Sequence, residues 1–104
     1  MEPEVVDNRE RQRFEVLLDG AVAGFVQYER RDGLLSLTHT EVPPEFEGRG
    51  LASALARASL QAARDEGLGV LPHCPYIRRY LQRHPDDADL VPAARREAFG
   101  LETT

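Results

Sequence analysis

The stretch EFEGRGLASALA at residues 45–56 most constrains how this chain can fold. It places two glycines, Gly48 and Gly50, between a strand-like segment and an alanine- and leucine-rich helix. The first turn of a helix has N–H groups without intrahelical partners, and they lie at the positive end of the helix dipole. Glycines at that point let the backbone approach an anion closely. The stretch therefore predicts a strand–turn–helix unit that binds a phosphate or pyrophosphate.

Three strand-like segments precede this unit, and each is rich in β-forming residues. Tight turns are expected between them, because Asp19-Gly20 and Arg31-Asp32-Gly33 separate the segments. We expect an antiparallel meander of residues 13–19, 22–30 and 34–42. The polar residues 1–12 are expected to form a flexible leader.

The hydrophobic period changes after the glycines. Apolar residues then recur at helical spacing, as one stripe of Leu51, Leu55, Ala58 and Ala62. Gly67 is suited to end that helix, and the apolar run at residues 68–71 predicts a buried strand. Because a strand–helix–strand crossover joins parallel strands, this last strand should lie parallel to the third. The fold class is therefore α/β, with a mixed sheet.

A second helix is expected after this strand. Pro75 suits its first position and makes Cys74 the N-cap, and the His84-Pro85 pair ends the helix. The core then spans residues 13–85. The C-terminal tail, residues 86–104, is expected to contain a short helix at 93–99. At 104 residues the chain is long enough for one hydrophobic core and too short for two.

Charge and composition exclude several classes of function. The net charge of −5 disfavours nucleic-acid binding, and no stretch has the apolar length of a membrane span. The absence of lysine excludes the phosphate loop of nucleoside triphosphatases, and Ser53 replaces the third glycine of a dinucleotide-binding fingerprint. A single cysteine fits a reducing cytoplasm, so a cytoplasmic protein is expected. No metal is expected, because the three histidines lack zinc-type spacing.

The glycine turn resembles motif A of the GCN5-related N-acetyltransferase (GNAT) superfamily, which reads Gln/Arg-x-x-Gly-x-Gly/Ala before a helix. Gly48 and Gly50 match its glycines, and Glu45 stands where the usual glutamine or arginine would be. Further segments resemble a minimal branch of about a hundred residues, the YjdJ-type acetyltransferases. These segments are HTEVP at 39–43, GRGLA at 48–52, Pro72-x-Cys74-Pro75-Tyr76 and His84-Pro85.

The resemblance implies an acetyl-CoA-dependent N-acetyltransferase that moves an acetyl group to a primary amine of a small molecule or protein. It also implies that the two parallel strands splay apart to admit the pantetheine arm. The turn's amides would then hold the pyrophosphate of acetyl-CoA. The implied cofactor-binding residues are Val42, Glu47, Gly48, Arg49, Gly50, Leu51 and Ala52.

Three residues are candidates for catalysis, each with a plainer alternative. Cys74 is expected at a helix N-terminus, a position that favours thiolate chemistry; it either takes the acetyl group covalently or only shapes the pocket during direct transfer. Tyr76 either protonates the departing CoA thiolate or packs in the core. His39 shares a strand face with Glu41 and either accepts a proton from the amine or is a core histidine.

Two other functions remain open from the sequence. One is a module that binds CoA or acyl-CoA without catalysis, and the other is a small interaction protein on the same fold. Cofactor binding without acetyl transfer would favour the first, and failure to bind CoA would favour the second.

Overall fold

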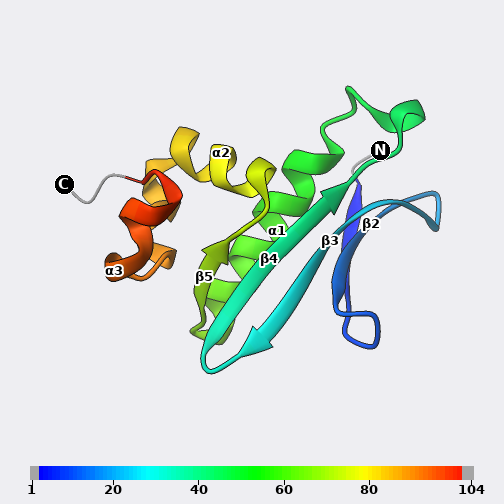
Figure 1. Ribbon diagram of the computed structural model, residues 1–104. Coiled ribbons are helices and arrows are strands. Elements are labelled where there is room, and N and C mark those ends of the chain that lie inside the picture. Colours follow the sequence, from blue (N-terminus) through cyan, green and yellow to red (C-terminus); the bar gives the residue numbers. More distant parts are fainter. Residues whose placement is uncertain (1–2, 102–104) are drawn as a thin grey trace.

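The computed structural model describes residues 3–101, which form one mixed sheet and its covering helices (Figure 1). The five strands lie in the order β1-β2-β3-β4-β5; the first four pair antiparallel, and β5 pairs parallel to β4. The strands are β1 (Glu4–Asn8), β2 (Arg13–Leu18), β3 (Ala21–Arg31), β4 (Leu34–Glu41) and β5 (Gly69–Pro72). The expected α/β fold, a meander followed by a βαβ crossover, is confirmed.

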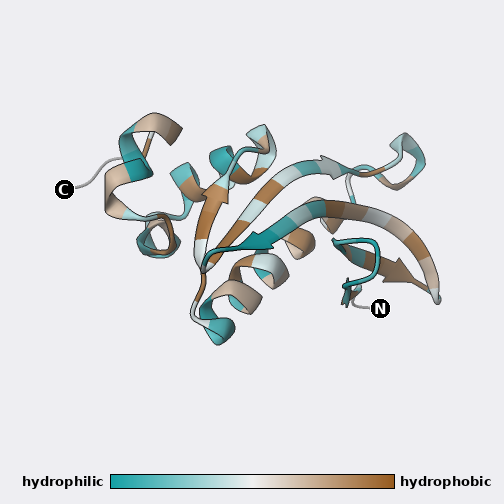
Figure 2. Ribbon diagram, turned by 60° about the horizontal axis from the view of Figure 1, so that its bottom comes forward, coloured by the Kyte–Doolittle hydropathy of each residue, from teal (hydrophilic) through white to brown (hydrophobic). Residues whose placement is uncertain are grey.

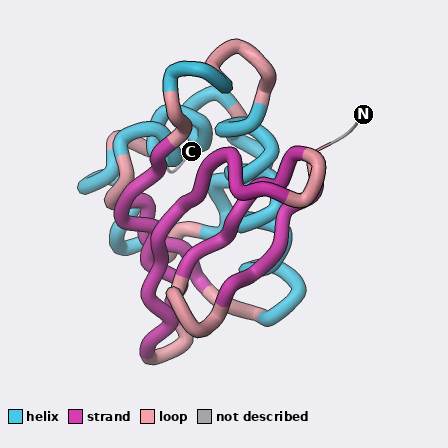
Figure 3. The backbone as a smooth tube through the Cα atoms, turned by 90° about the vertical axis from the view of Figure 1, so that its right-hand side faces the viewer, coloured by secondary structure: helices cyan, strands magenta, loops and turns pink. Residues whose placement is uncertain are grey.

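Helix α1 (Leu51–Glu66) makes the crossover, and α2 (Pro75–Arg83) follows β5. The remaining helical segments are η1 (Pro44–Phe46), η2 (Pro85–Leu90), α3 (Ala93–Arg96) and η3 (Glu97–Phe99). Helical turns thus occupy residues 93–99, where a short helix was expected. In side view the strands form one curved layer with most of the helical segments behind it (Figure 3).

The expectation of a flexible leader at residues 1–12 is wrong for residues 4–8, which form the edge strand β1. Val5 lies opposite Val16 of β2 and packs against the core. A strand this short, with polar residues on both sides, gives little periodic signal; it is stabilised by its pairing with β2. Met1 and Glu2 lie outside the described residues.

The core lies between the sheet and α1. Hydrophobic and hydrophilic residues alternate along the strands (Figure 2), and Val26, Leu35 and Leu37 are fully buried. The predicted helix stripe is partly right: Leu51 and Leu55 are buried, whereas the two alanines at 58 and 62 are only half-buried. The buried face of α1 includes Ser59 in place of those two alanines. The Ser59 hydroxyl donates to the Ala56 carbonyl at 3.0 Å.

Strands β4 and β5 separate after four paired residues. Their register runs from Leu34 opposite Gly69 to Leu37 opposite Pro72, and the Cys74 N–H then donates to the Leu37 carbonyl at 2.8 Å. Beyond that point β4 continues to Glu41 beside β3, while the chain after β5 turns into α2. The two parallel strands therefore splay, as expected.

A β-bulge lies in β4 at the start of this splay. Gln27 pairs with His39 and Tyr28 pairs with Leu37, so Thr38 is an extra residue in β4. One extra residue reverses which side chains face each side of a strand. Before the bulge, Leu35 and Leu37 are the residues of β4 that face the core. After the bulge, Thr40 and Val42 face that same side of the sheet.

The guanidinium of Arg30 links the edge strand to the end of α1. It bonds Glu66 through two nitrogens, at 2.8 and 3.0 Å, and Asp7 at 2.9 Å. It also lies 4.6 Å from the ring centroid of Tyr28, whose hydroxyl donates to Asp7. The hydrogen bond from Arg30 lowers the pKa of Glu66. A carboxyl group whose pKa is lower in the folded chain than in the unfolded chain adds to the free energy of unfolding at pH values above its unfolded-state pKa. This contribution is lost as the pH falls through its folded-state pKa.

We therefore expect Arg30→Met to cost about 1 kcal/mol of unfolding free energy near pH 7. The difference from the unchanged protein should shrink as the pH falls below the ordinary glutamate pKa of about 4.3. Urea unfolding at several pH values measures this. Arg31→Met is the matched control, because the Arg31 side chain is 77% exposed and its nearest carboxylate oxygen is 3.8 Å away. A difference that stays constant with pH would contradict the prediction.

Candidate functional site

The glycine turn before α1 presents a run of free backbone donors. Gly48 and Gly50 have φ values of 82° and 74°, in the left-handed region that favours glycine, and Gly50 is the N-cap of α1. The Glu47 N–H bonds the Pro44 carbonyl, and Ala54 is the next residue with a bonded N–H, to the Gly50 carbonyl at 3.0 Å. Within residues 3–101 the N–H groups of residues 48–53 have no protein acceptor. They lie where the helix dipole is positive.

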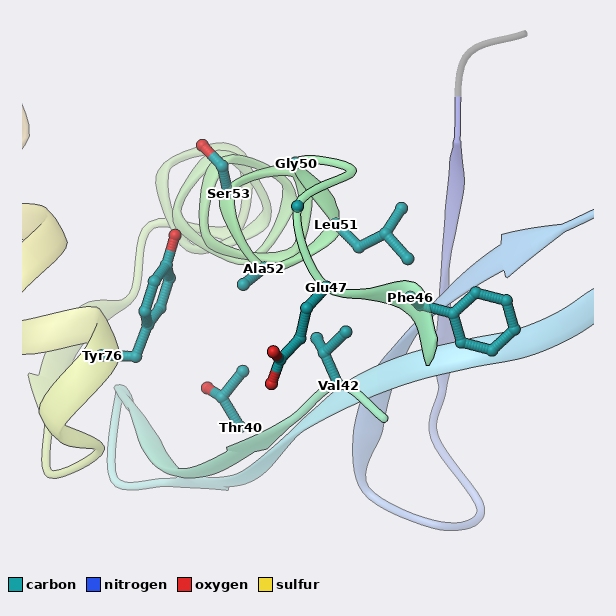
Figure 4. A pocket seen from close by; sticks show the side chains of 10 residues that line it. Thr40, Val42, Phe46, Glu47, Gly50, Leu51, Ala52, Ser53 and Tyr76 are labelled. Atoms are coloured by element: carbon teal, nitrogen blue, oxygen red, sulfur yellow. The ribbon is translucent and has the colours of Figure 1, made fainter. Parts of the chain in front are cut away.

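These donors border an open cavity of about 310 Å³ (Figure 4). We call it the glycine-turn cavity; it is lined by Thr40, Val42, Phe46, Glu47, Gly48, Gly50, Leu51, Ala52, Ser53 and Tyr76. Its walls are the start of α1, the splayed end of β4 and the first turn of α2. All the cofactor-binding residues predicted from the sequence line it except Arg49. Thr40, Phe46 and Ser53 also line the cavity but were not predicted from the sequence. Ser53 could have been predicted, because it lies in the first turn of α1, three residues after Gly50.

Arg49 lies on the other side of the turn. Its guanidinium is 5.8 Å from the ring centroid of Phe46, and it borders another hollow with Leu18, Asp19 and Ala21, which shares Phe46 and Leu51 with the glycine-turn cavity. Arg49 lies between the two glycines, and its side chain does not line the glycine-turn cavity.

Cys74 is the N-cap of α2, as the sequence indicated, but its thiol lies behind the cavity wall. The residue is 2% exposed, and its Sγ is 3.0 Å from the hydroxyl oxygen of Thr40. Thr40 lines the glycine-turn cavity, and Cys74 does not. The thiol thus contacts the site through one intervening side chain.

His39 lies away from the glycine-turn cavity. As expected it shares a face with Glu41, with 3.6 Å between His39 Nε2 and the Glu41 carboxylate. Both side chains are more than half exposed, so the core-histidine alternative does not describe His39. The bulge at Thr38 explains the placement, because it gives the cavity side of β4 to Thr40 and Val42.

Tyr76 and Glu47 are the two largest polar side chains of the cavity, which also has the hydroxyls of Thr40 and Ser53. Tyr76, half-buried in the first turn of α2, stands on the wall opposite Phe46 (Figure 4). The carboxylate of Glu47 points between Val42 and Thr40, into the space enclosed by the walls (Figure 4). Glu47 is an exposed residue.

In this α/β protein a strand splays from its parallel neighbour beside a glycine turn, a helix N-terminus and an open cavity. The family model described as GCN5-related N-acetyl-transferase matches residues 13–90. The chain belongs to this family.

Several named relatives are similar over most of the chain. Protein NATD1 of Mus musculus is 36% identical over 85 residues, covering 78% of this chain and 76% of that protein. Protein NATD1 of Danio rerio is 30% identical over 83 residues, with the same coverage. The NMR solution structure of a GCN5-like protein from Staphylococcus aureus matches with a TM-score of 0.66. It is 20% identical and covers 86% of this chain and 87% of that chain, a likeness that concerns the fold alone.

The helices over residues 3–101 are all too short or too polar to cross a membrane. In the same part of the chain, no three histidine, cysteine or carboxylate side chains are grouped closely enough to hold a metal ion.

Proposed function

We propose that this protein is an acetyl-CoA-dependent N-acetyltransferase that acts on a primary amine. The observation that carries the proposal is the run of free N–H donors at residues 48–53 beside the opening between β4 and β5. Backbone donors at a helix N-terminus bind phosphate groups without any basic side chain. Binding of phosphate by backbone donors suits this chain, because its net charge is −5 and the Arg49 side chain borders a different hollow.

Each wall of the glycine-turn cavity has a part in holding the cofactor. The N–H groups of residues 48–53 would bind the pyrophosphate, and Leu51 and Ala52 would border it. Thr40 and Val42 would contact the pantetheine arm, along the stretch of β4 that β5 no longer pairs. Acetyl-CoA supplies an activated acetyl thioester.

Tyr76 is the proposed acid. Its side chain borders the cavity, and its phenolic O–H is a donor that can deliver a proton to a leaving sulfur there. His39, paired with Glu41, is the proposed base for an amine that approaches from the outer face of β4. The amine must lose its proton before it attacks a carbonyl carbon.

Two measurements on the same sample test the proposal. Calorimetry with CoA tests binding, and thiol release from acetyl-CoA across a panel of primary amines tests transfer. Binding with transfer is the expected result. Binding without transfer to any amine would indicate a non-catalytic CoA-binding module instead, and no binding would indicate an interaction protein on the same fold.

The burial of Cys74 favours direct attack by the amine over a cysteine intermediate. Cys74→Ala should therefore keep acetyl transfer within about threefold of the unchanged protein, since no covalent step is lost. Intact mass spectrometry after incubation with acetyl-CoA should show no adduct that hydroxylamine removes. The readout is clean because the chain has no lysine, which leaves Cys74 and the amino terminus as the plausible acceptors. A hydroxylamine-labile adduct that is absent from Cys74→Ala would establish the cysteine route.

A further inference from the structure

A third space, a hollow of about 340 Å³, opens between the start of α1 and α2. We call it the arginine hollow; it is lined by Ser53, Tyr76, Arg79, Tyr80, Arg83 and His84. It shares Ser53 and Tyr76 with the glycine-turn cavity, so the two spaces adjoin. The pyrophosphate and pantetheine assignments above use none of its other residues.

Helical spacing places both arginines on one side of α2. Tyr76, Arg79, Tyr80 and Arg83 follow one another at i, i+3, i+4 and i+7. Both arginines are exposed, and none of the ion pairs formed within residues 3–101 includes either of them. Two unpaired guanidinium groups on one helix face form a local site for an anion in a protein that is acidic overall.

Neighbouring charges reinforce this positive character. Arg57 of α1 donates to the hydroxyl of Ser53 at 3.3 Å, at the border shared with the glycine-turn cavity. The carboxylate that acts on Tyr80 is Asp87, and Arg64 holds it at 3.2 Å. The lining of the arginine hollow itself has two arginines and no carboxylate.

The hollow also has a flat aromatic wall. The rings of Tyr80 and His84 stack with centroids 3.9 Å apart and 17° between their planes. His84 Nδ1 lies 2.8 Å from the Tyr80 carbonyl oxygen, which fixes the imidazole. Burial raises the pKa of Tyr80, so its phenol stays neutral and does not repel an anion. Stacked rings beside guanidinium groups suit a nucleoside carrying a phosphate monoester.

We infer that the arginine hollow binds the 3′-phosphate of the cofactor's adenosine, so that the protein selects CoA over dephospho-CoA. This inference rests on the proposed function, because it places the two ends of one cofactor in two adjoining spaces. Ser53 is three residues after Gly50, roughly 5 Å along the helix axis. Ser53 borders both spaces, so they adjoin at the first turn of α1.

Calorimetry with CoA and with dephospho-CoA tests the inference on the unchanged protein, Arg79→Ala and Arg83→Ala. The unchanged protein should bind CoA roughly tenfold more tightly, as expected for charge-assisted hydrogen bonds at an open site. Each variant should lose most of that preference through weaker CoA binding, with dephospho-CoA affinity unchanged within about twofold. Arg31→Ala, which removes the same charge at the far end of β3, should keep the full preference.

Equal affinities for CoA and dephospho-CoA in the unchanged protein would overturn the inference and leave the proposed function standing. The same holds if the arginine variants weaken both ligands equally. Failure of both ligands to bind the unchanged protein would instead overturn the proposed function, and the inference with it. Thermal unfolding without ligand confirms that each variant is folded.

Discussion

Gly50→Ala is expected to lower the affinity for CoA roughly thirtyfold or more, because two or more charge-assisted hydrogen bonds to the turn are lost. Gly50 has a φ of 74°, and a Cβ there meets no atom within 4 Å. The substitution therefore does not crowd the fold. It strains a left-handed backbone whose shape directs the N–H groups of residues 48–53 toward one point.

Gly33→Ala is the matched control for this variant. Gly33 has a φ of 76° and the same open surroundings, but it lies in the turn between β3 and β4, at the opposite end of β4. Both substitutions should cost about 1 kcal/mol of unfolding free energy, measured by urea unfolding. Only Gly50→Ala should lose CoA binding in calorimetry. Unchanged affinity in Gly50→Ala would remove the phosphate site from the proposal.

Tyr76→Phe is expected to reduce acetyl transfer about a hundredfold, the usual contribution of a positioned acid, while CoA affinity stays within about threefold. The ring that borders both the glycine-turn cavity and the arginine hollow is kept, and only the hydroxyl is lost. The measurement is the rate of thiol release from acetyl-CoA, with the most reactive amine of the panel at saturating concentration.

Tyr80→Phe controls for the loss of a hydroxyl one helical turn further along α2. Tyr80 lines the arginine hollow and not the glycine-turn cavity. The acetyl-transfer rate of Tyr80→Phe should therefore stay within about threefold of that of the unchanged protein. If Tyr76→Phe transfers acetyl groups as fast as Tyr80→Phe, the tyrosine packs against the cofactor and does not act as an acid.

The local patterns in the sequence predicted the order of the elements from residue 13 to residue 83. Hydrophobic period and turn residues are local properties, so the meander, the crossover helix and the helix after Cys74 could be read from short windows. The strand β1 could not, because Val5 is stabilised by a partner eleven residues away. The five residues of β1 taken alone do not indicate that they pair with β2.

The β-bulge limited the prediction of the candidate site. Counting by twos from the buried Leu35 and Leu37 assigns His39 to the core side of β4, and the extra Thr38 reverses that assignment. Residue type alone does not predict where a bulge falls, since it arises from the fit between β3 and β4. The direction of the Arg49 side chain, which lies over Phe46 outside the glycine-turn cavity, also could not be predicted from residue type.

The donors of the glycine turn belong to the main chain, and this has an evolutionary consequence. Replacement of Glu45, Glu47 or Arg49 leaves every one of those amides in place, whereas replacement of either glycine changes the direction in which they point. Glu45, at the position where glutamine or arginine is usual in motif A, illustrates this freedom. Mutational drift should therefore accumulate around the two glycines, and remote relatives should be sought by the spacing of the glycines rather than by the residues between them.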